Sequence, residues 1–404
     1  MLTEIDRNLV KATAPVLQEH GVTLTRHFYA RMFAHHPELR ELFNQGHQRN
    51  GDQQKALAMA VAAYAAHIED PSVLMPVLER IAAKHVSLGI RKEHYAIVGH
   101  HLLASISEVL GAAATRELLD AWAAAYAQLA DLLAGLEQGL YDSAASADGG
   151  WTGWRTFRVR RKSAESDEIT SFEIVPADGG PVPLYRPGQY ISVRIIVAEL
   201  GYRQARQYSL SDAPGKDSFR ISVKRERAHD QRPGGMVSNT LHDQVNEGGL
   251  LEVAPPAGDF FLDEDSRDPV VLISGGVGIT PMMSMLEHLA ATAPDRTVRF
   301  LHATRHAGAQ AFGLRVEELV DRMSDAQSWI VHESGLAPVA GRYHAAGRLE
   351  LSGLTGSALL PKNADYYICG PDGFMRAQIH ALRELGTPDR RIHAEAFGSG
   401  GVAA

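Results

Sequence analysis

The sequence predicts three domains, in the order all-α, antiparallel β and α/β, and three observations support this division. The chain has 404 residues, which is enough for two or three domains of roughly 150 residues each. Residues 1–150 hold only 4 of the 19 prolines and 10 of the 37 glycines, and their apolar residues recur at intervals of three and four. From Trp151 the apolar period changes to two, and from Pro269 apolar strands alternate with helical stretches.

A small, polar stretch separates the first domain from the second. Residues 143–150 read Ser-Ala-Ala-Ser-Ala-Asp-Gly-Gly, which is the composition of a linker. We therefore expect a helical domain at 1–140, a linker at 141–151, a β domain at 152–265 and an α/β domain at 266–404.

The strands of the two later domains are visible as short β-branched runs bounded by glycine and proline. Three runs predict an antiparallel sheet or barrel: 169–175, 189–197 and 219–223. In the α/β domain we expect strands at 270–274, 298–302 and 365–369, and a helix from about Pro281 to Ala291.

Composition narrows the function classes. The formal charge is −8 and no run of lysine and arginine stands out, so we expect no nucleic-acid partner. The longest apolar stretch, Ala56–Ala66, is shorter than the ~20 residues that span a bilayer. Acidic Glu4 and Asp6 do not suit the start of a secretory signal, and a single cysteine, Cys369, fits a reducing compartment. We expect a cytoplasmic protein without stable membrane insertion.

Two motifs of the predicted β domain suit a flavin. Arg206-Gln-Tyr-Ser-Leu210 lies on a predicted strand, where a guanidinium can pair with a pyrophosphate and a tyrosine ring can cover an isoalloxazine. Taken alone, an ordinary barrel strand explains it better. Pro233–Asn239 offers glycine amides and the Ser238 hydroxyl as a phosphate cradle, or it is a plain turn.

Two motifs of the predicted α/β domain suit a nicotinamide nucleotide. Gly275-Gly-Val-Gly-Ile-Thr-Pro281 follows an apolar strand and precedes a helix, so its amides can approach a pyrophosphate. It departs from the G-x-G-x-x-G spacing and is weak by itself. Cys369-Gly-Pro371 ends a second strand at the rim where such sheets bind ligands, and Phe397 stands near the chain end.

In this order, the four motifs resemble those of the ferredoxin–NADP reductase family over residues 152–398. The resemblance implies contacts of FAD with Tyr190, Arg206, Gln207, Tyr208, Ser209, Ser238 and Phe397. It also implies contacts of the nucleotide with Gly275, Gly276, Gly278 and Thr280, and it places Cys369 beside the nicotinamide ring.

In the helical domain, His85 lies on an apolar face formed with Leu74, Leu78, Ile81 and Leu88. A histidine there is usually a core residue bonded to a carbonyl, but a haem iron also needs one imidazole in an apolar wall. A second stripe runs through Gln53, Leu57, Val61, Tyr64 and Ile68. Its polar start suits a bound gas better than a core.

These residues look like those of a globin over residues 1–140. The resemblance implies that His85 ligates the iron, that Phe43 stacks on the porphyrin, and that Tyr29, Gln53 and Leu57 lie on the distal side. With the reductase motifs, the whole chain resembles the flavohaemoglobins. That resemblance further implies that Tyr95 and Glu137 hydrogen-bond the proximal histidine, and that Lys84 and Glu395 lie near the haem–flavin boundary. The family ending E-x-F-G-P is not kept after Gly398.

The resemblance implies a nitric oxide dioxygenase that converts NO and O2 to nitrate, with electrons passing from NADH or NADPH through FAD to haem b. The choice between NADH and NADPH stays open, and we expect a monomer. The alternatives are a globin gas sensor with a resetting reductase, or a general flavin reductase of ferric iron or hydroperoxides. Alanine-rich residues 56–63 further predict a roomy distal pocket for an apolar ligand or lipid.

Overall fold

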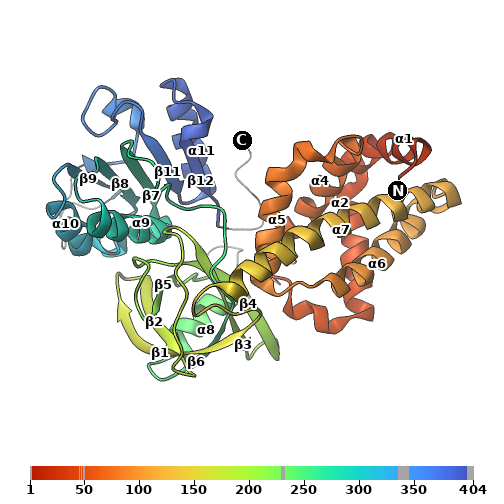
Figure 1. Ribbon diagram of the computed structural model, residues 1–404, viewed down its shortest axis with the longest axis horizontal. Helices are drawn as coiled ribbons and strands as arrows, with labels where there is room; N and C mark the ends of the chain where they lie inside the picture. Colours follow the sequence, from red (N-terminus) through yellow and green to blue (C-terminus); the bar gives the residue numbers. More distant parts are fainter. Residues whose placement is uncertain are drawn as a thin grey trace. The chain divides into compact units, whose positions relative to one another are not determined.

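The protein is described by a computed structural model that covers residues 2–44, 46, 48, 51–228, 233–334 and 345–397. The chain divides into two compact units (Figure 1). The first comprises residues 1–146 with 151–154 and 194–206, and the second comprises the remaining residues. Residues 398–404, in which the family ending is not kept, lie outside the described residues.

Residues up to Ser146, which make up most of the first unit, fold into helices, as the sequence predicts. They are α1 (Glu4–Ala12), α2 (Ala14–His35), α4 (Asp52–Ala66), α5 (Met75–Leu88), α6 (Lys92–Leu110) and α7 (Arg116–Ser146). Short 3₁₀ turns occupy Pro37–Glu41, Pro71–Leu74 and Gly111–Ala113. The Thr3 hydroxyl caps α1 by accepting from the Asp6 amide at 3.1 Å.

Small residues let α2 and α4 approach closely. A Cβ on Gly21 of α2 would lie 3.1 Å from the Ala58 Cβ of α4. Three alanines of α4 are buried: Ala58, Ala62 and Ala65. Several alanines that predicted a roomy pocket are therefore used for packing between helices.

Helix α7 continues to Ser146, beyond the start of the expected linker at residue 141. The physical reason is that Tyr141 is anchored: its hydroxyl donates to the Ile90 carbonyl at 2.6 Å and its ring lies 3.8 Å from the Arg91 guanidinium carbon. A buried aromatic residue with a satisfied hydroxyl stabilises the extra turns. The linker composition therefore describes only the residues after this helix.

One described segment, residues 92–113, is long and apolar enough by composition alone to cross a membrane. In the structure this segment is α6 with its following turn. Its Leu102 and Ile106 are buried in the core of the helical unit. A core helix passes the same compositional test, so this observation does not indicate a membrane protein.

The β domain is the antiparallel barrel that the sequence predicts. Its strands are β1 (Arg155–Ala164), β2 (Ile169–Pro176), β3 (Tyr190–Val197), β4 (Tyr202–Ser209), β5 (Phe219–Lys224) and β6 (Leu250–Val253). Their order is β4-β3-β6-β1-β2-β5, and an antiparallel bridge between Leu210 and Ile221 joins the two ends of that order. Helix α8 (Met236–Gln244) follows β5. Closing the sheet removes exposed edges and buries Phe157, Phe172 and Phe219 inside.

The last domain is a parallel sheet with helices on both faces. Its strands are β7 (Val270–Gly275), β8 (Val298–Thr304), β9 (Ala326–His332), β10 (Ala345–Ala346), β11 (Asp365–Cys369) and β12 (Ile392–Glu395). Helices α9 (Ile279–Thr292) and α10 (Gly313–Asp321) cover one face, and α11 (Asp372–Glu384) covers the other (Figure 1). The order is β10-β9-β8-β7-β11-β12, so the sequence of strands reverses between β7 and β11. Ligands of such sheets bind outside the carboxyl ends of the strands at this reversal.

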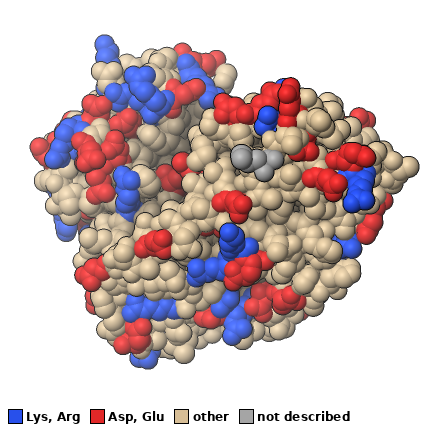
Figure 2. Space-filling model, turned by 45° about the vertical axis from the view of Figure 1, so that its right-hand side comes forward, with Lys and Arg blue, Asp and Glu red and all other residues tan. Residues whose placement is uncertain are grey.

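On the face drawn in Figure 2, lysines and arginines are intermixed with aspartates and glutamates. Such mixing fits the small formal charge of −8 over 404 residues.

Candidate functional site

The helical unit brings three predicted site residues together around one imidazole. The Nδ1 atom of His85, on α5, lies 2.8 Å from Glu137 Oε1 and 3.1 Å from the Tyr95 hydroxyl. The Tyr95 hydroxyl donates to the same Glu137 oxygen at 2.5 Å. Because a carboxylate only accepts, the proton of His85 belongs on Nδ1, which leaves the Nε2 lone pair free for a metal.

Burial makes this hydrogen bond strong. Glu137 is only 2% exposed, whereas 32% of the His85 side chain remains accessible. Burial, donation to Glu137 and the charge of Glu137 all raise the pKa of Tyr95, which therefore stays a donor. A partly accessible imidazole that is backed by a buried carboxylate fits the donor set expected of a haem iron ligand.

Two further tyrosines of α7 support this group and were missed by the sequence analysis. The Tyr126 hydroxyl donates to the Tyr95 carbonyl at 2.7 Å, and Tyr141 holds the Ile90 carbonyl just beyond His85. Tyr126 also requires Gly99, where a Cβ would lie 2.5 Å from its ring. The spacing Tyr126, Glu137, Tyr141 repeats on one helix face, and that periodicity was the available signal.

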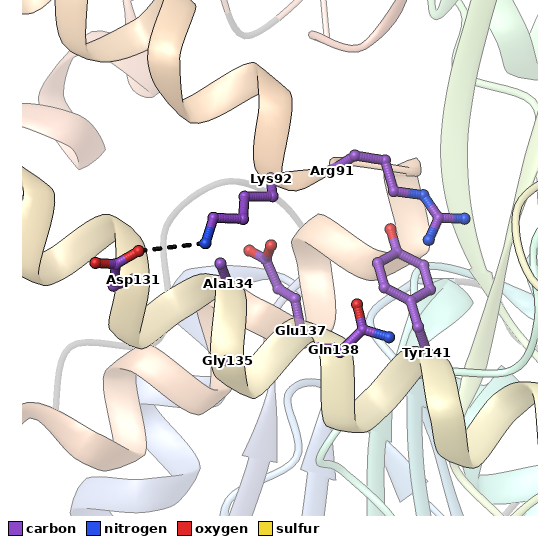
Figure 3. Close-up of a pocket in the computed structure, with 8 residues that line it drawn as sticks. All are labelled: Arg91, Lys92, Asp131, Ala134, Gly135, Glu137, Gln138 and Tyr141. Carbon is purple, nitrogen blue, oxygen red and sulfur yellow. Dashed lines mark ion pairs between the residues drawn. The ribbon is translucent and has the colours of Figure 1, made fainter.

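A polar cavity of about 350 Å³ borders the same carboxylate (Figure 3). It is lined by Arg91, Lys92, Asp131, Ala134, Gly135, Glu137, Gln138 and Tyr141. Lys92 and Asp131 form an ion pair of 3.5 Å across it. Glu137 thus belongs both to the His85 group and to the wall of this cavity, so changes of charge in the cavity act on Glu137 at short range.

Tyr29 of α2 lies in an aromatic cluster. Its ring centroid is 4.9 Å from Phe28, 5.8 Å from Phe33 and 5.6 Å from Phe43. Burial raises the pKa of Tyr29, so its hydroxyl is a neutral donor. Among the residues that the structure describes, this hydroxyl has no hydrogen-bond partner. A buried donor without a protein partner fits a site where a small ligand supplies the acceptor.

Gln53 and Leu57 lie at the start of α4. The Gln48 amide donates to Gln53 Oε1 at 2.9 Å, and Leu57 packs against the same aromatic cluster as Tyr29. The adjacent Gln54 is more deeply buried and was missed; it donates to Gln48 Oε1 at 2.8 Å. Its Oε1 has no partner within the described ranges. The two neighbouring glutamines at the helix start were the available signal.

Lys84 immediately precedes His85 on α5. It is half-buried, and its carbonyl accepts from the Ser87 hydroxyl at 2.8 Å. Lys84 belongs to the first unit and Glu395, at the end of β12, belongs to the second. The roles expected for them near a haem–flavin boundary stay predictions.

The expected flavin residues occupy β3, β4 and their surroundings. Tyr190 opens β3 and lies against Gly258, where a Cβ would be 2.8 Å from the Tyr190 ring and where φ is +108°. Residues 206–208 of β4 are half-buried and Ser209 is buried. Arg206 donates to the Ala205 carbonyl at 2.6 Å, and Phe397 is 47% exposed. Glycine at position 258 therefore leaves room for the Tyr190 ring itself, and the flavin contacts of these residues stay predictions.

The turn before α8 is closed tightly around Ser238. Its hydroxyl donates to the Gly235 carbonyl at 3.1 Å and accepts from the Glu226 amide at 3.4 Å. A Cβ on Gly235 would lie 2.5 Å from the Ser238 oxygen, so only glycine fits there. The Gly235 amide also donates to the Glu226 carbonyl at 2.8 Å, so these groups bond within the turn, and the phosphate cradle expected here stays a prediction.

The glycines after β7 have two separate physical roles. Gly276 has φ +54° and a Cβ there would meet nothing within 4 Å, so this glycine leaves open space above the turn. A Cβ on Gly278 would lie 2.2 Å from the Cys369 carbonyl oxygen. Gly278 thus allows the turn after β7 to approach the end of β11 closely, and the open space at Gly276 is compatible with the phosphate contact predicted there.

Thr280 and Cys369 stand beside this turn. The Thr280 hydroxyl donates to the Val277 carbonyl at 3.1 Å. Cys369 is fully buried, and burial together with the nearby charge of Glu395 raises the pKa of its thiol. The thiol is therefore protonated at neutral pH, and it is not an exposed reactive cysteine.

Comparisons with known proteins agree with this architecture. A family model for globins matches residues 26–133, and one for the oxidoreductase NAD-binding domain matches residues 272–380. The chain is 60% identical to the "Flavohemoprotein" of Bordetella parapertussis over 100% of both chains. It is 59% identical to that of Chromobacterium violaceum over 99% of both.

Solved structures give the same result. A flavohemoglobin of Malassezia yamatoensis with bound FAD and heme has a TM-score of 0.86 at 28% identity, covering 98% of this chain and 100% of that chain. The FAD/NAD-binding domain of a nitric oxide dioxygenase from Vibrio cholerae has a TM-score of 0.56 at 40% identity, covering 60% and 98%.

The fold and the site therefore define a globin joined to an NAD-binding oxidoreductase module. At this level of identity over the full length, the chain belongs to the flavohaemoprotein family. The fold class expected from the sequence is confirmed, and so is the family resemblance.

Proposed function

We propose that this flavohaemoprotein is a nitric oxide dioxygenase that uses haem b in residues 1–140, FAD in 152–265 and NADH or NADPH in 266–404. The net reaction is 2 NO + 2 O2 + NAD(P)H → 2 NO3⁻ + NAD(P)⁺ + H⁺. The observation that carries the proposal is the buried Glu137 carboxylate on the Nδ1 atom of His85. Nitric oxide dioxygenase activity is named for the Vibrio cholerae relative, which supports the proposal.

When bound, haem supplies an iron that takes up O2, and FAD supplies acceptance of a hydride and release of single electrons. The protein supplies the surroundings. His85 Nε2 would hold the iron, while Glu137 accepts the Nδ1 proton and makes the imidazole a stronger electron donor. Tyr95 fixes the carboxylate by donating to it.

On the distal side, Tyr29 would be the hydrogen-bond donor toward a small ligand in the haem pocket. Its hydroxyl is available because no described residue accepts from it. Gln53 adds a second donor, since its Oε1 is occupied by Gln48 and its amide nitrogen donates to none of the described residues. Leu57 keeps water away and, together with Phe43, forms the apolar wall.

On the reductase side, Arg206 and Ser238 would hold the FAD phosphates, while Tyr190 and Tyr208 flank the ring. Gln207, Ser209 and Phe397 complete the flavin site. The open turn at Gly276, with Gly275, Gly278 and Thr280, would take the nucleotide pyrophosphate. Cys369 would contact the nicotinamide as a neutral thiol.

Four finer points belong to the same proposal. We place the protein in the cytoplasm, as a monomer, with O2 and nitric oxide as its small-molecule partners. Displacement of Leu57 would admit an apolar ligand or lipid to the distal pocket. The composition supports the location through its single cysteine.

The proposal is tested by following NADH oxidation in the purified holoprotein. We expect oxidation to need both O2 and nitric oxide, with two nitrate formed per NADH. Oxidation that ignores nitric oxide would indicate a general flavin reductase. Haem that is reduced but never turns over would indicate a gas sensor.

The distal residues are tested by Tyr29→Phe. Hydrogen bonds to a charged acceptor contribute about 1.5–3 kcal/mol, so O2 should dissociate roughly ten- to a hundredfold faster. Stability should hardly change, because the hydroxyl has no partner in the described part of the chain. The double variant Tyr29→Phe/Gln53→Leu should release O2 faster than either single variant. An unaltered off-rate in the double variant would remove Tyr29 from the site.

A further inference from the structure

A buried cluster of charges joins the β domain to the α/β domain within the second unit. Glu287, in the middle of α9, is 5% exposed and its carboxyl group is a hydrogen-bond neighbour of the buried Asp212 carboxyl. Burial and the charge of Asp212 raise the pKa of Glu287. Two carboxyl groups this close, away from water, need cations or a shared proton.

Three cations surround the pair, and they come from different elements. Arg220 of β5 and Arg315 of α10 each place a nitrogen 3.2 Å from Glu287 Oε1. Lys216, in the turn before β5, pairs with Asp212 and lies 3.6 Å from Glu287 Oε2. Glu287 is therefore contacted from the barrel on one side and from the neighbouring helix of its own domain on the other.

The main chain beside Asp212 is held in the same way. The Asp212 carbonyl accepts from the Ser284 hydroxyl of α9 at 2.6 Å and from the Tyr185 hydroxyl at 2.5 Å. Arg220 donates to the Ser211 carbonyl. The α9 residue Met285 lies against the barrel loop at Gly188, where a Cβ would be 2.6 Å from its methyl group. Several independent contacts thus set one placement of α9 on the barrel.

The positions of these residues along the chain connect the cluster to both proposed cofactor sites. Thr280, Ser284 and Glu287 follow the spacing i, i+4, i+7 and share one face of α9. Thr280 belongs to the proposed nucleotide turn. Asp212 lies three residues after Ser209, which ends β4, the proposed flavin strand. One helix face therefore carries the nucleotide end and the anchor to the flavin strand.

Stability alone does not explain the use of charges here. Replacing a buried ionic group by well-packed apolar residues is often neutral or stabilising, because burial of charges costs free energy. What directional ion pairs and hydrogen bonds add is one defined geometry. In hydride transfer a misplacement of about 1 Å can cost a hundredfold in rate, so a defined geometry is valuable.

We propose that Glu287, with Asp212, Ser284 and Arg220, is a positioning group that sets the nicotinamide site against the flavin site for hydride transfer. The group touches neither cofactor and acts through the placement of α9 on the barrel. The inference rests on the proposed function, since it concerns the reduction of FAD by NAD(P)H.

The test compares Glu287→Gln with the wild type as full-length holoprotein, mixed anaerobically with NADH. Asp325→Asn is the control, because it removes a carboxylate that bonds Arg299 and Thr297 rather than the residues of this cluster. We expect the limiting rate of flavin reduction to fall at least tenfold in Glu287→Gln. The long-wavelength charge-transfer absorbance between nicotinamide and flavin should fall with it. The NADH concentration for half-saturation should change less than threefold, and the control should match the wild type.

A milder variant keeps the test decisive if Glu287→Gln folds poorly. Ser284→Ala removes one hydrogen bond to the Asp212 carbonyl and no charge. We expect a two- to fivefold loss of the limiting rate with a weaker charge-transfer band, and an unchanged FAD content. If both variants keep the wild-type rate and band, even with lowered melting temperatures, the cluster is only structural and the inference is wrong. If neither NADH nor NADPH reduces the flavin of the wild type, the proposed function fails instead.

Discussion

The helical unit and the nucleotide-binding domain present their candidate functional groups in different ways. Around His85 the chemistry depends on side chains: one imidazole, one carboxylate and one phenol from three helices. Around the turn after β7 it depends on the main chain, with Gly276 open to a ligand and Gly278 pressed against Cys369.

This difference shows what each region tolerates. A side-chain site can lose one hydrogen bond and keep its fold, because the helices are held by their own core. A main-chain site at the meeting point of two strands cannot gain one methyl group without displacing a strand. Substitutions should therefore separate function from stability in the helical unit and combine them in the nucleotide-binding domain.

The largest effect is expected for Gly278→Ala. Its φ of −61° is open to any residue, so the cost comes only from the new Cβ, 2.2 Å from the Cys369 carbonyl oxygen. We expect a loss of about 3 kcal/mol or more in unfolding free energy, measured by guanidinium denaturation with flavin fluorescence. Gly373→Ala is the control: its Cβ meets nothing within 4 Å, and alanine in α11 should add up to about 1 kcal/mol. Equal stabilities of the two variants would contradict the main-chain argument.

Each region also contains a buried neutral histidine, and acid should reveal both. Burial lowers the pKa of His101 and of His302 to about 4. An unfolded histidine takes up its proton near pH 6.5, so the folded state loses stability as pH falls from about 6.5 toward 4. At pH 5 the loss is about 2 kcal/mol for each residue.

Two substitutions assign these losses to their regions. We expect His101→Gln to reduce the loss of stability at low pH in thermal melts followed by haem absorbance. His302→Gln should reduce the corresponding loss in melts followed by flavin fluorescence. His380→Gln, an exposed position, is the control. A wild-type dependence on pH in either buried variant would show that its histidine is not the titrating group.

A smaller effect is expected for Glu137→Gln, which tests the side-chain site without changing its shape. A neutral amide accepts the His85 proton more weakly, so the imidazole donates less electron density and ferric haem is less stabilised. The haem midpoint potential should rise by up to about 60 mV, which is tenfold for one electron. The control residue Gln138 lines the same cavity, and its side chain donates to Asp142 and not to His85. Gln138→Ala should therefore leave the haem midpoint potential unchanged. Equal potentials in the two variants would remove Glu137 from the iron site.

The smallest effect is expected for Cys369→Ser. The thiol is fully buried and protonated, so the hydroxyl adds polarity where little can satisfy it. We expect flavin reduction by NADH to slow by three- to tenfold, about 1 kcal/mol, with haem and FAD contents unchanged. Unchanged stopped-flow reduction would leave Cys369 as a packing residue at the end of β11.

Much of the architecture could be predicted from the sequence because its signals are local. The glycine turn at 275–278, the strands before it and the change of apolar period near Trp151 are each visible within a short window. The extension of α7 to Ser146 could not be predicted, because it depends on a hydrogen bond from Tyr141 to Ile90, 51 residues away. Tyr126 was missed for the same reason, because the Tyr95 carbonyl that it donates to lies 31 residues away on another helix.

Three things could be predicted from the amino-acid sequence alone: the order of the domains, the strands and helices that carry the motifs, and the choice of His85 as the candidate iron ligand. Periodicity and turn chemistry act over a few residues, so they need no knowledge of the fold. Two contacts become visible only in the folded chain: Glu137 bonds His85, 52 residues away in the sequence, and Arg220 bonds Glu287, 67 residues away. Such contacts depend on how the helices and sheets pack, because the strength of a buried charge or hydrogen bond is set by the groups that exclude water from it.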